Sequence, residues 1–196
     1  MHPDRTVSSI PISGFILSIL FLLAIAAQPL IAKAKAEDRF HQVVDVSGLE
    51  EVTLETVNGS IEVTGCDGDQ VTLDATLKVE GRNEEKCREL LEKIKIEIEK
   101  KNTTLEIDYD AKSKRGYSIM VSYTLLAPSR MKIDAETVNG SIDLKKINGG
   151  VDAETINGGI HCVEIKGRAS AETINGGIEF ENSTGEIHAE AINGGI

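Results

Sequence analysis

Residues 135–140 read Ala-Glu-Thr-Val-Asn-Gly, and nearly the same hexapeptide returns every 18 residues, at 153–158, 171–176 and 189–194. A shorter period lies inside this one, because glycine recurs every nine residues from Gly140 to Gly194. Apolar side chains keep the same phase, two, four and seven residues after these glycines. A repeat that holds its phase over so many copies indicates stacked units of equivalent structure.

The spacing within each unit predicts a short β-strand followed by a bend. Side chains at positions i and i+2 share one face of a strand. Asn-Gly then supplies a corner, because both residues tolerate positive φ. The expected corners are Asn139–Gly140, Asn157–Gly158, Asn175–Gly176 and Asn193–Gly194.

We therefore predict a mainly β fold of the β-solenoid type, parallel β-helix-like, in which one 18-residue coil consists of two nonapeptides. Stacked coils would place each Asn over its copy, where side-chain amides form hydrogen-bonded ladders. Asn-Gly between apolar runs is also the strongest short signal for a hairpin, so an antiparallel β-meander is the alternative.

The apolar position seven residues after each glycine is expected to face the core. Because a charge there would be buried, Ile156→Asp is expected to unfold the repeats. This column comprises Ile147, Ile156, Ile165, Ile174, Ser183 and Ile192.

A different pattern interrupts the repeats between about residues 83 and 127. Asn83 is a good N-cap, and apolar side chains at helical spacing predict one short amphipathic helix over 84–94. Alternating patterns then predict a hairpin that turns at Asn102 and a strand over 117–125. The regular repeats occupy 131–196 and stop in mid-coil, as if truncated. Such an open end exposes strand edges, so self-association through the C-terminal coil is expected.

The N-terminus carries the pattern of a secretory signal peptide. A 13-residue run from Phe15 to Ala27 is broken only by Ser18, and Ala34-Lys35-Ala36 forms an A-x-A cleavage site. The run is shorter than the ~20 residues that a membrane span needs, although a retained anchor is the alternative. We expect a signal peptide at 1–36, a β-repeat domain at 37–196, and a periplasmic or extracellular location, with association with the cell surface as one form of the latter.

Composition excludes several classes of protein. The net charge is -11, from 21 Lys and Arg against 32 Asp and Glu, which is the wrong sign for binding nucleic acid. A hydrophobic share of 40% excludes wholesale disorder. The three cysteines form no C-x-x-C pair or Cys/His cluster, so we expect neither metal nor cofactor. An exported chain could still form a disulfide between Cys66 and Cys87.

No catalytic constellation is recognisable, and we expect no enzymatic activity. The sequence contains no nucleophile elbow and no H-E-x-x-H motif. His161 and His188 both fall on outward phases of alternate nonapeptides, and should lie on opposite faces. A polysaccharide-active enzyme is the alternative, with Asp143, Glu179 and Glu181 as the nearest candidate carboxylates.

Two charged groups are candidates for surface contacts. Glutamates spaced by 18 would form a column on one face, although like charges on adjacent strands are destabilising. A basic cluster lies in a loop. The candidate residues are Glu136, Glu154, Glu172, Glu190, Lys112, Lys114 and Arg115.

The copies of Glu-Thr-[Val/Ile]-Asn-Gly-[Ser/Gly]-Ile, the helix near 84–94 and the return to Asn-Gly at 139 resemble the bacterial putative-adhesin family of β-strand-repeat proteins. The resemblance covers roughly residues 40–196 and implies a solenoid-like fold in the cell envelope. It provides no catalytic residues. We expect an exported, adhesin-like or scaffolding surface whose partner is an envelope glycan, lipid or protein. A periplasmic sensor or regulatory partner in envelope stress is the alternative.

Overall fold

The computed structural model describes residues 33–196, which form one unit. The predicted signal peptide falls outside the described residues up to position 32, and Ala34–Ala36 begin the first strand. Among the residues described, no helix is long and apolar enough to cross a bilayer.

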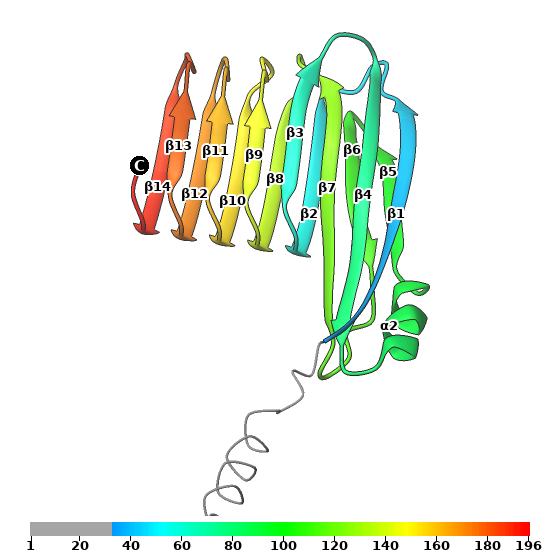
Figure 1. The fold of residues 1–196 in the computed structure, drawn as a ribbon. Helices are drawn as coiled ribbons and strands as arrows, with labels where there is room; N and C mark the ends of the chain where they lie inside the picture. The colour runs from blue at the N-terminus through cyan, green and yellow to red at the C-terminus, as the bar shows by residue number, and fades with distance from the viewer. Residues whose placement is uncertain (1–32) are drawn as a thin grey trace, which may run out of the picture. The chain divides into compact units, whose positions relative to one another are not determined.

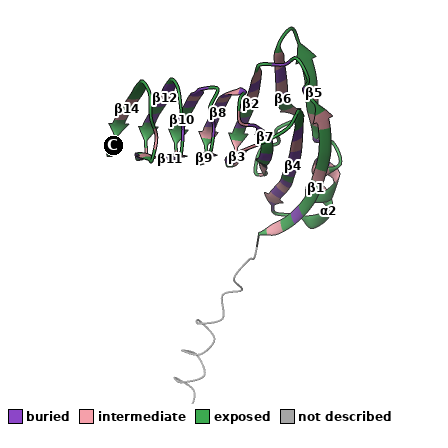
Figure 2. Cartoon of the chain, turned by 90° about the horizontal axis from the view of Figure 1, so that it is seen from above, coloured by how far each residue is buried: buried purple, intermediate pink, exposed green. Residues whose placement is uncertain are grey.

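Two seven-stranded sheets, here called sheet A and sheet B, make up this unit (Figure 1). Their strand orders are β1-β4-β7-β3-β9-β11-β13 and β14-β12-β10-β8-β2-β6-β5. Sheet A comprises β1 (Ala34–Asp45), β3 (Ile61–Cys66), β4 (Gln70–Gly81), β7 (Ser118–Pro128), β9 (Ile142–Lys145), β11 (Ile160–Val163) and β13 (Ile178–Glu181). Sheet B comprises β2 (Glu51–Asn58), β5 (Lys95–Lys101), β6 (Thr104–Asp110), β8 (Lys132–Asn139), β10 (Val151–Asn157), β12 (Ala169–Asn175) and β14 (Ile187–Asn193). Their inward side chains meet in one apolar core, and Figure 2 shows buried and exposed residues alternating along the strands.

The prediction of a parallel β-helix-like solenoid is wrong, because both sheets are mixed and the fold is sandwich-like. β4 pairs antiparallel with β1 and β7, and β5 pairs antiparallel with β6. The nonapeptide pattern carries no information on these segments, whose long alternating runs favour extended antiparallel pairing. The antiparallel meander is wrong too, because β8, β10, β12 and β14 pair parallel while successive strands alternate between the sheets.

The repeat strands align residue by residue with their own copies. In sheet B, Ala135, Ala153 and Ala171 lie opposite one another, and in sheet A, Leu144 lies opposite Cys162. Buried threonines on β2, β8, β10 and β12 donate their hydroxyl protons to backbone carbonyls of neighbouring segments. Thr155 donates to the carbonyl of Gly140 at 3.1 Å, and Thr173 donates to that of Gly158 at 3.0 Å.

The bend between strands differs between the two kinds of nonapeptide, which corrects the third apolar column. After the short strands of sheet A, Lys146 and Glu164 adopt φ of 59° and 56°, and the next residues, Ile147 and Ile165, turn into the core. In the longer strands of sheet B, alternation continues to the buried threonine. Ile156 therefore faces outward with 41% exposure, and the expectation that Ile156→Asp buries a charge is wrong.

The Asn-Gly pairs owe their glycines to close approach between strands. Gly140, Gly158, Gly176 and Gly194 are not among the residues with positive φ, so the expected conformational reason is wrong for them. A Cβ on Gly158 would lie 1.9 Å from the carbonyl oxygen of Gly140, and one on Gly176 would lie equally close to that of Gly158. The backbone of the preceding copy thus lies too near for a side chain at these positions.

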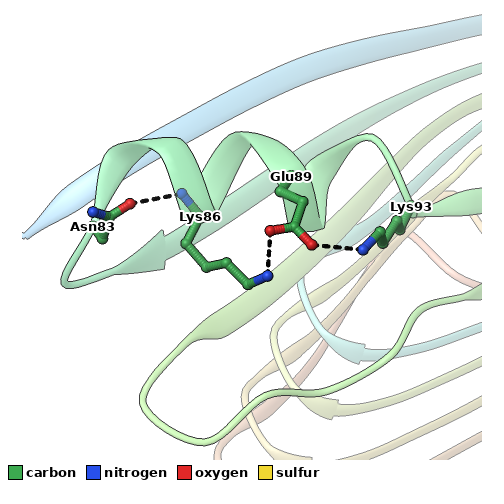
Figure 3. Close-up of polar contacts among 4 residues, drawn as sticks. All are labelled: Asn83, Lys86, Glu89 and Lys93. Carbon is green, nitrogen blue, oxygen red and sulfur yellow. Dashed lines mark hydrogen bonds and ion pairs between the residues drawn. The ribbon is translucent and has the colours of Figure 1, made fainter.

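Helix α2 (Glu84–Leu91) confirms the predicted helix and its cap, although it ends at Leu91 and not at residue 94 (Figure 3). The Asn83 side chain accepts a hydrogen bond from the backbone N–H of Lys86 at 2.8 Å. Glu89 bridges Lys86 and Lys93, with 2.7 Å to the Lys93 Nζ. These two hydrogen bonds lower the pKa of Glu89 to about 2. Cys87 and Leu90 face the core, and the helix packs against β1 and β4.

All three cysteines are free. The Cys66–Cys87 disulfide that the sequence allowed is therefore absent. Cys66 ends β3, whereas Cys87 lies on α2 with its thiol 3.6 Å from the Ala34 carbonyl. Burial raises the pKa of the Cys162 thiol to about 12, so this residue serves as a small apolar side chain in the core.

Candidate functional site

The outer face of sheet B carries an aligned row of glutamates, which we call the Glu row. Its members are in register across five strands, β2, β8, β10, β12 and β14, so neighbouring carboxylates stand about 4.8 Å apart at their backbones. The structure thus brings together all four glutamates that the 18-residue spacing selected and adds one from β2. The row comprises Glu55, Glu136, Glu154, Glu172 and Glu190.

Like charges in the Glu row repel one another around Glu136, which has a glutamate on each neighbouring strand. Burial raises the pKa of Glu136, and the carboxylates of Glu154, Asp134 and Glu55 raise it further. Like charges on adjacent strands oppose folding, so a cationic partner placed along the row would relieve this repulsion.

A row of branched aliphatic side chains runs beside the Glu row, and we call it the aliphatic row. Ile156 and Ile174 are 41% and 39% exposed, and Ile192 is 65% exposed. The row comprises Val57, Val138, Ile156, Ile174 and Ile192. Sequence reasoning assigned Ile156, Ile174 and Ile192 to the core. A threonine precedes Ile156 and Ile174, and this is the signal that they lie outside the core. Side chains alternate strictly along the strand, so the residue after a buried threonine faces outward.

The two rows line one groove of about 660 Å³. Tyr109 and Asp108 of β6 also line it. Burial raises the pKa of Tyr109 above its usual value, and so does the charge of Asp108. The groove thus presents acidic and apolar groups side by side along several consecutive strands.

An asparagine row closes the edge of this face. Asn157 donates from its side-chain nitrogen to the side-chain oxygen of Asn139 at 2.9 Å, and Asn175 donates to Asn157 at 2.9 Å. The same bond joins Asn139 to Asn58 at 2.9 Å and Asn193 to Asn175 at 3.0 Å. Because each amide is held by its copies, these side chains are fixed in place.

The basic cluster lies elsewhere. Lys112, Lys114 and Arg115 occupy the exposed loop between β6 and β7 and do not line the groove. The Lys114 Nζ lies 5.8 Å from the centre of the Tyr117 ring. Partial loss of hydration, together with the nearby Lys86, lowers the pKa of Lys114. The structure therefore does not combine the two charged groups into one site.

The two histidines on outward phases lie on different sheets, as expected, with His161 on β11 and His188 on β14. Asp143, Glu179 and Glu181, the candidate carboxylates of a polysaccharide enzyme, surround His161 on the outer face of sheet A. Asp143, His161 and Glu179 are spaced by 18 residues, and this spacing could have revealed the cluster from the sequence.

Comparison with known proteins finds no matching family model and no matching curated protein. Solved structures similar to this chain include a putative cell adhesion protein from Clostridium sporogenes, 13% identical with a TM-score of 0.39, for which the match covers 82% of this chain and 98% of that one. A putative adhesin from Parabacteroides merdae is 8% identical with a TM-score of 0.31, covering 83% and 96%. A putative adhesin from Bacteroides fragilis is 13% identical with a TM-score of 0.28, covering 81% and 97%.

These names agree with the family that the repeat motif resembles. Because every TM-score is below 0.5, we derive no site and no ligand from these proteins.

Proposed function

We propose that this protein is an exported, non-enzymatic component of the bacterial cell envelope and that the groove on sheet B is its adhesin-like or scaffolding contact surface. The observation that carries the proposal is the pairing of two continuous rows, one acidic and one aliphatic, on the same face of consecutive strands. Isolated exposed apolar residues are ordinary on protein surfaces, whereas contiguous apolar patches mark interaction sites.

The geometry favours a partner that repeats along the sheet. Each strand contributes a carboxylate and an aliphatic side chain two residues apart, as Glu154 with Ile156 and Glu172 with Ile174 do, and these positions are in register with those of the next strand. A repeating envelope glycan, lipid surface or extended protein segment with cationic groups would meet the same contacts on successive strands. Many weak contacts of one kind then add up to useful avidity.

The test compares two double variants of the full chain for binding to envelope fractions and to glycan and lipid arrays. Ile156→Thr with Ile174→Thr removes the centre of the aliphatic row, and we expect binding to fall by about tenfold or more. Val43→Thr with Leu126→Thr is the matched control, because these side chains are similarly exposed, at 47% and 48%, but lie on sheet A.

Equal binding by the two double variants, or no binding of the wild type to any envelope component, would contradict the proposal. Raised salt should weaken binding if the Glu row contributes. A screen of the same preparation for release of polysaccharide reducing ends tests the non-enzymatic part. Activity that disappears with Glu179→Gln would contradict it.

A further inference from the structure

A second cluster, on the opposite sheet from the groove, combines nitrogen and oxygen donors. Asp143 of β9, His161 of β11 and Glu179 of β13 lie directly opposite one another in the parallel register. Glu181 follows Glu179 on the same face of β13. The inward neighbours Ile160 and Cys162 are buried, which fixes the His161 ring on the outer face.

The donor atoms lie at the spacing of ligands around one metal ion. Donor atoms of His161, Glu179 and Glu181 all lie within 4.8 Å of one another. The His161 Nε2 and a Glu181 carboxylate oxygen are 3.6 Å apart, which exceeds a hydrogen bond. Two ligands bound at 2.0–2.2 Å to a tetrahedral ion stand about 3.4 Å apart, so small side-chain movements would complete the site.

The Nε2 atom itself lacks a partner. It is buried from solvent and forms no hydrogen bond, although the imidazole as a whole is partly exposed, with 35% of the side chain accessible. A buried ring nitrogen without a hydrogen bond is costly, and a metal ion is the partner that neutral imidazole nitrogens commonly bind.

Asp143 is placed to orient the ring. Its Oδ1 lies 3.6 Å from the His161 Nδ1, and its Oδ2 accepts a hydrogen bond from the Ser141 hydroxyl at 3.3 Å. At this distance the two atoms are not yet hydrogen-bonded, but a small movement would let the Asp143 carboxylate accept the Nδ1 proton and leave the Nε2 lone pair free for a metal, which is the usual outer-shell arrangement of metal-binding histidines. The nearby Lys145 Nζ is directed to Glu62 at 3.6 Å and does not neutralise the cluster.

We propose that His161, Glu179 and Glu181 bind a divalent transition-metal ion, with Zn²⁺ as the best fit to one imidazole and two carboxylates, and that Asp143 orients the imidazole. Three protein ligands leave a coordination position open. His161 and Glu179, but not Glu181, also line a hollow of about 470 Å³. This site lies on sheet A and does not depend on the groove of the proposed function.

Isothermal titration of the full chain with Zn²⁺ alone tests this inference. We expect one saturable site that His161→Ala removes, and that Glu179→Gln and Glu181→Gln each weaken. Asp143→Asn should weaken binding by about 10-fold, within the range typical of outer-shell partners. His188→Ala is the matched control, because it changes an outward histidine of sheet B, and Cys66→Ser controls for binding by the half-buried thiol.

Thermal unfolding of the same samples keeps the test decisive if a variant is unstable. Zn²⁺ should raise the Tm of the wild type, His188→Ala and Cys66→Ser, and should leave the Tm of His161→Ala unchanged. Zn²⁺ binding that survives His161→Ala, that disappears with either control, or that is absent from the wild type would overturn the proposal.

Discussion

The repeat strands β8–β14 and the long strands β1, β4 and β7 build one core by different means. The repeat strands run for four to eight residues, whereas the long strands run for 11 or 12. The core beneath β8, β10 and β12 contains Ala135, Ala153 and Ala171, whereas β7 contributes the fully buried Tyr123. The repeat region therefore depends on close backbone stacking, and the long strands depend on large side chains.

This difference predicts at which positions a substitution most destabilises each region. In the repeats, a residue lies opposite its own copies 18 positions before and after it, so a substitution that disturbs the backbone affects the stacking on both neighbouring strands. In the long strands, partners come from distant and dissimilar segments, as β4 does from β1 and β7. We expect the repeats to be most sensitive at glycine and the long strands to be most sensitive at bulky residues.

The largest effect is expected from Gly158→Ala. Its Cβ would lie 1.9 Å from the Gly140 carbonyl oxygen, so two stacked strands must separate, at a cost of about 3 kcal/mol or more. The matched control is Gly177→Ala, whose Cβ would stand 3.6 Å from the Gly195 carbonyl oxygen. Urea unfolding measures both, and equal losses of stability would refute the close-approach explanation.

The next effect distinguishes the two kinds of nonapeptide. Ile165→Ala empties a position with 1% exposure and should cost about 3 kcal/mol. Ile156→Ala changes a residue with 41% exposure and should cost about 0.5 kcal/mol. Chemical denaturation of the two variants measures the difference. A larger loss of stability for Ile156→Ala would mean that Ile156 is buried like Ile165, as the sequence predicted.

The asparagine row should contribute a smaller, graded amount. Asn157→Ala breaks side-chain bonds to Asn139 and Asn175, and at about 0.5–1.5 kcal/mol per bond it should cost about 1–3 kcal/mol. Asn193→Ala breaks the bond to Asn175 and should cost about half as much. Equal denaturation midpoints for the two variants would show that the hydrogen bonds of the asparagine row do not contribute to stability.

In the long strands, one substitution should stabilise the protein. The Tyr123 hydroxyl is buried and forms no hydrogen bond within the described chain, and burial raises its pKa. Tyr123→Phe removes that unpaired group while keeping the ring, so stability should rise by about 1 kcal/mol. Calorimetry measures the change, and a lower Tm for the variant would mean that the hydroxyl has a partner.

The smallest effect concerns pH and helix α2. The pKa of Glu89 is about 2 in the folded protein, below the ordinary value of 4.5, because Lys86 and Lys93 bond to the carboxylate. Its stabilisation is therefore complete above pH 4.5 and is lost as the pH falls toward 2. Glu89→Gln should lower the Tm slightly at pH 7 and leave it unchanged near pH 2. A pH-independent difference would contradict this assignment.

Several features could be predicted from particular residues. A helix that begins at residue 84, its Asn83 cap and the hairpin that turns at Asn102 follow from local signals, and the structure contains each of them, with the helix ending at Leu91 and not at the predicted residue 94. The placement of His161 and His188 on different faces follows from strand alternation alone. The 18-residue spacing of Asp143, His161 and Glu179 indicates the cluster in the sequence, whereas the unpartnered Nε2 of His161 and its distance to Glu181 are visible only in the structure.

The sequence alone determined the mainly β composition, the 18-residue alignment of the copies and the Glu row, because periodic spacing sets which side chains share a face. Only the tertiary structure decided that the sheets are mixed, that Ile156 lies outside while Ile165 lies inside, and why the glycines of the Asn-Gly pairs are required. The physical reason is that strand direction, bend geometry and backbone separation depend on which segments become neighbours, and a repeat in the sequence does not specify the neighbours of the segments that interrupt it.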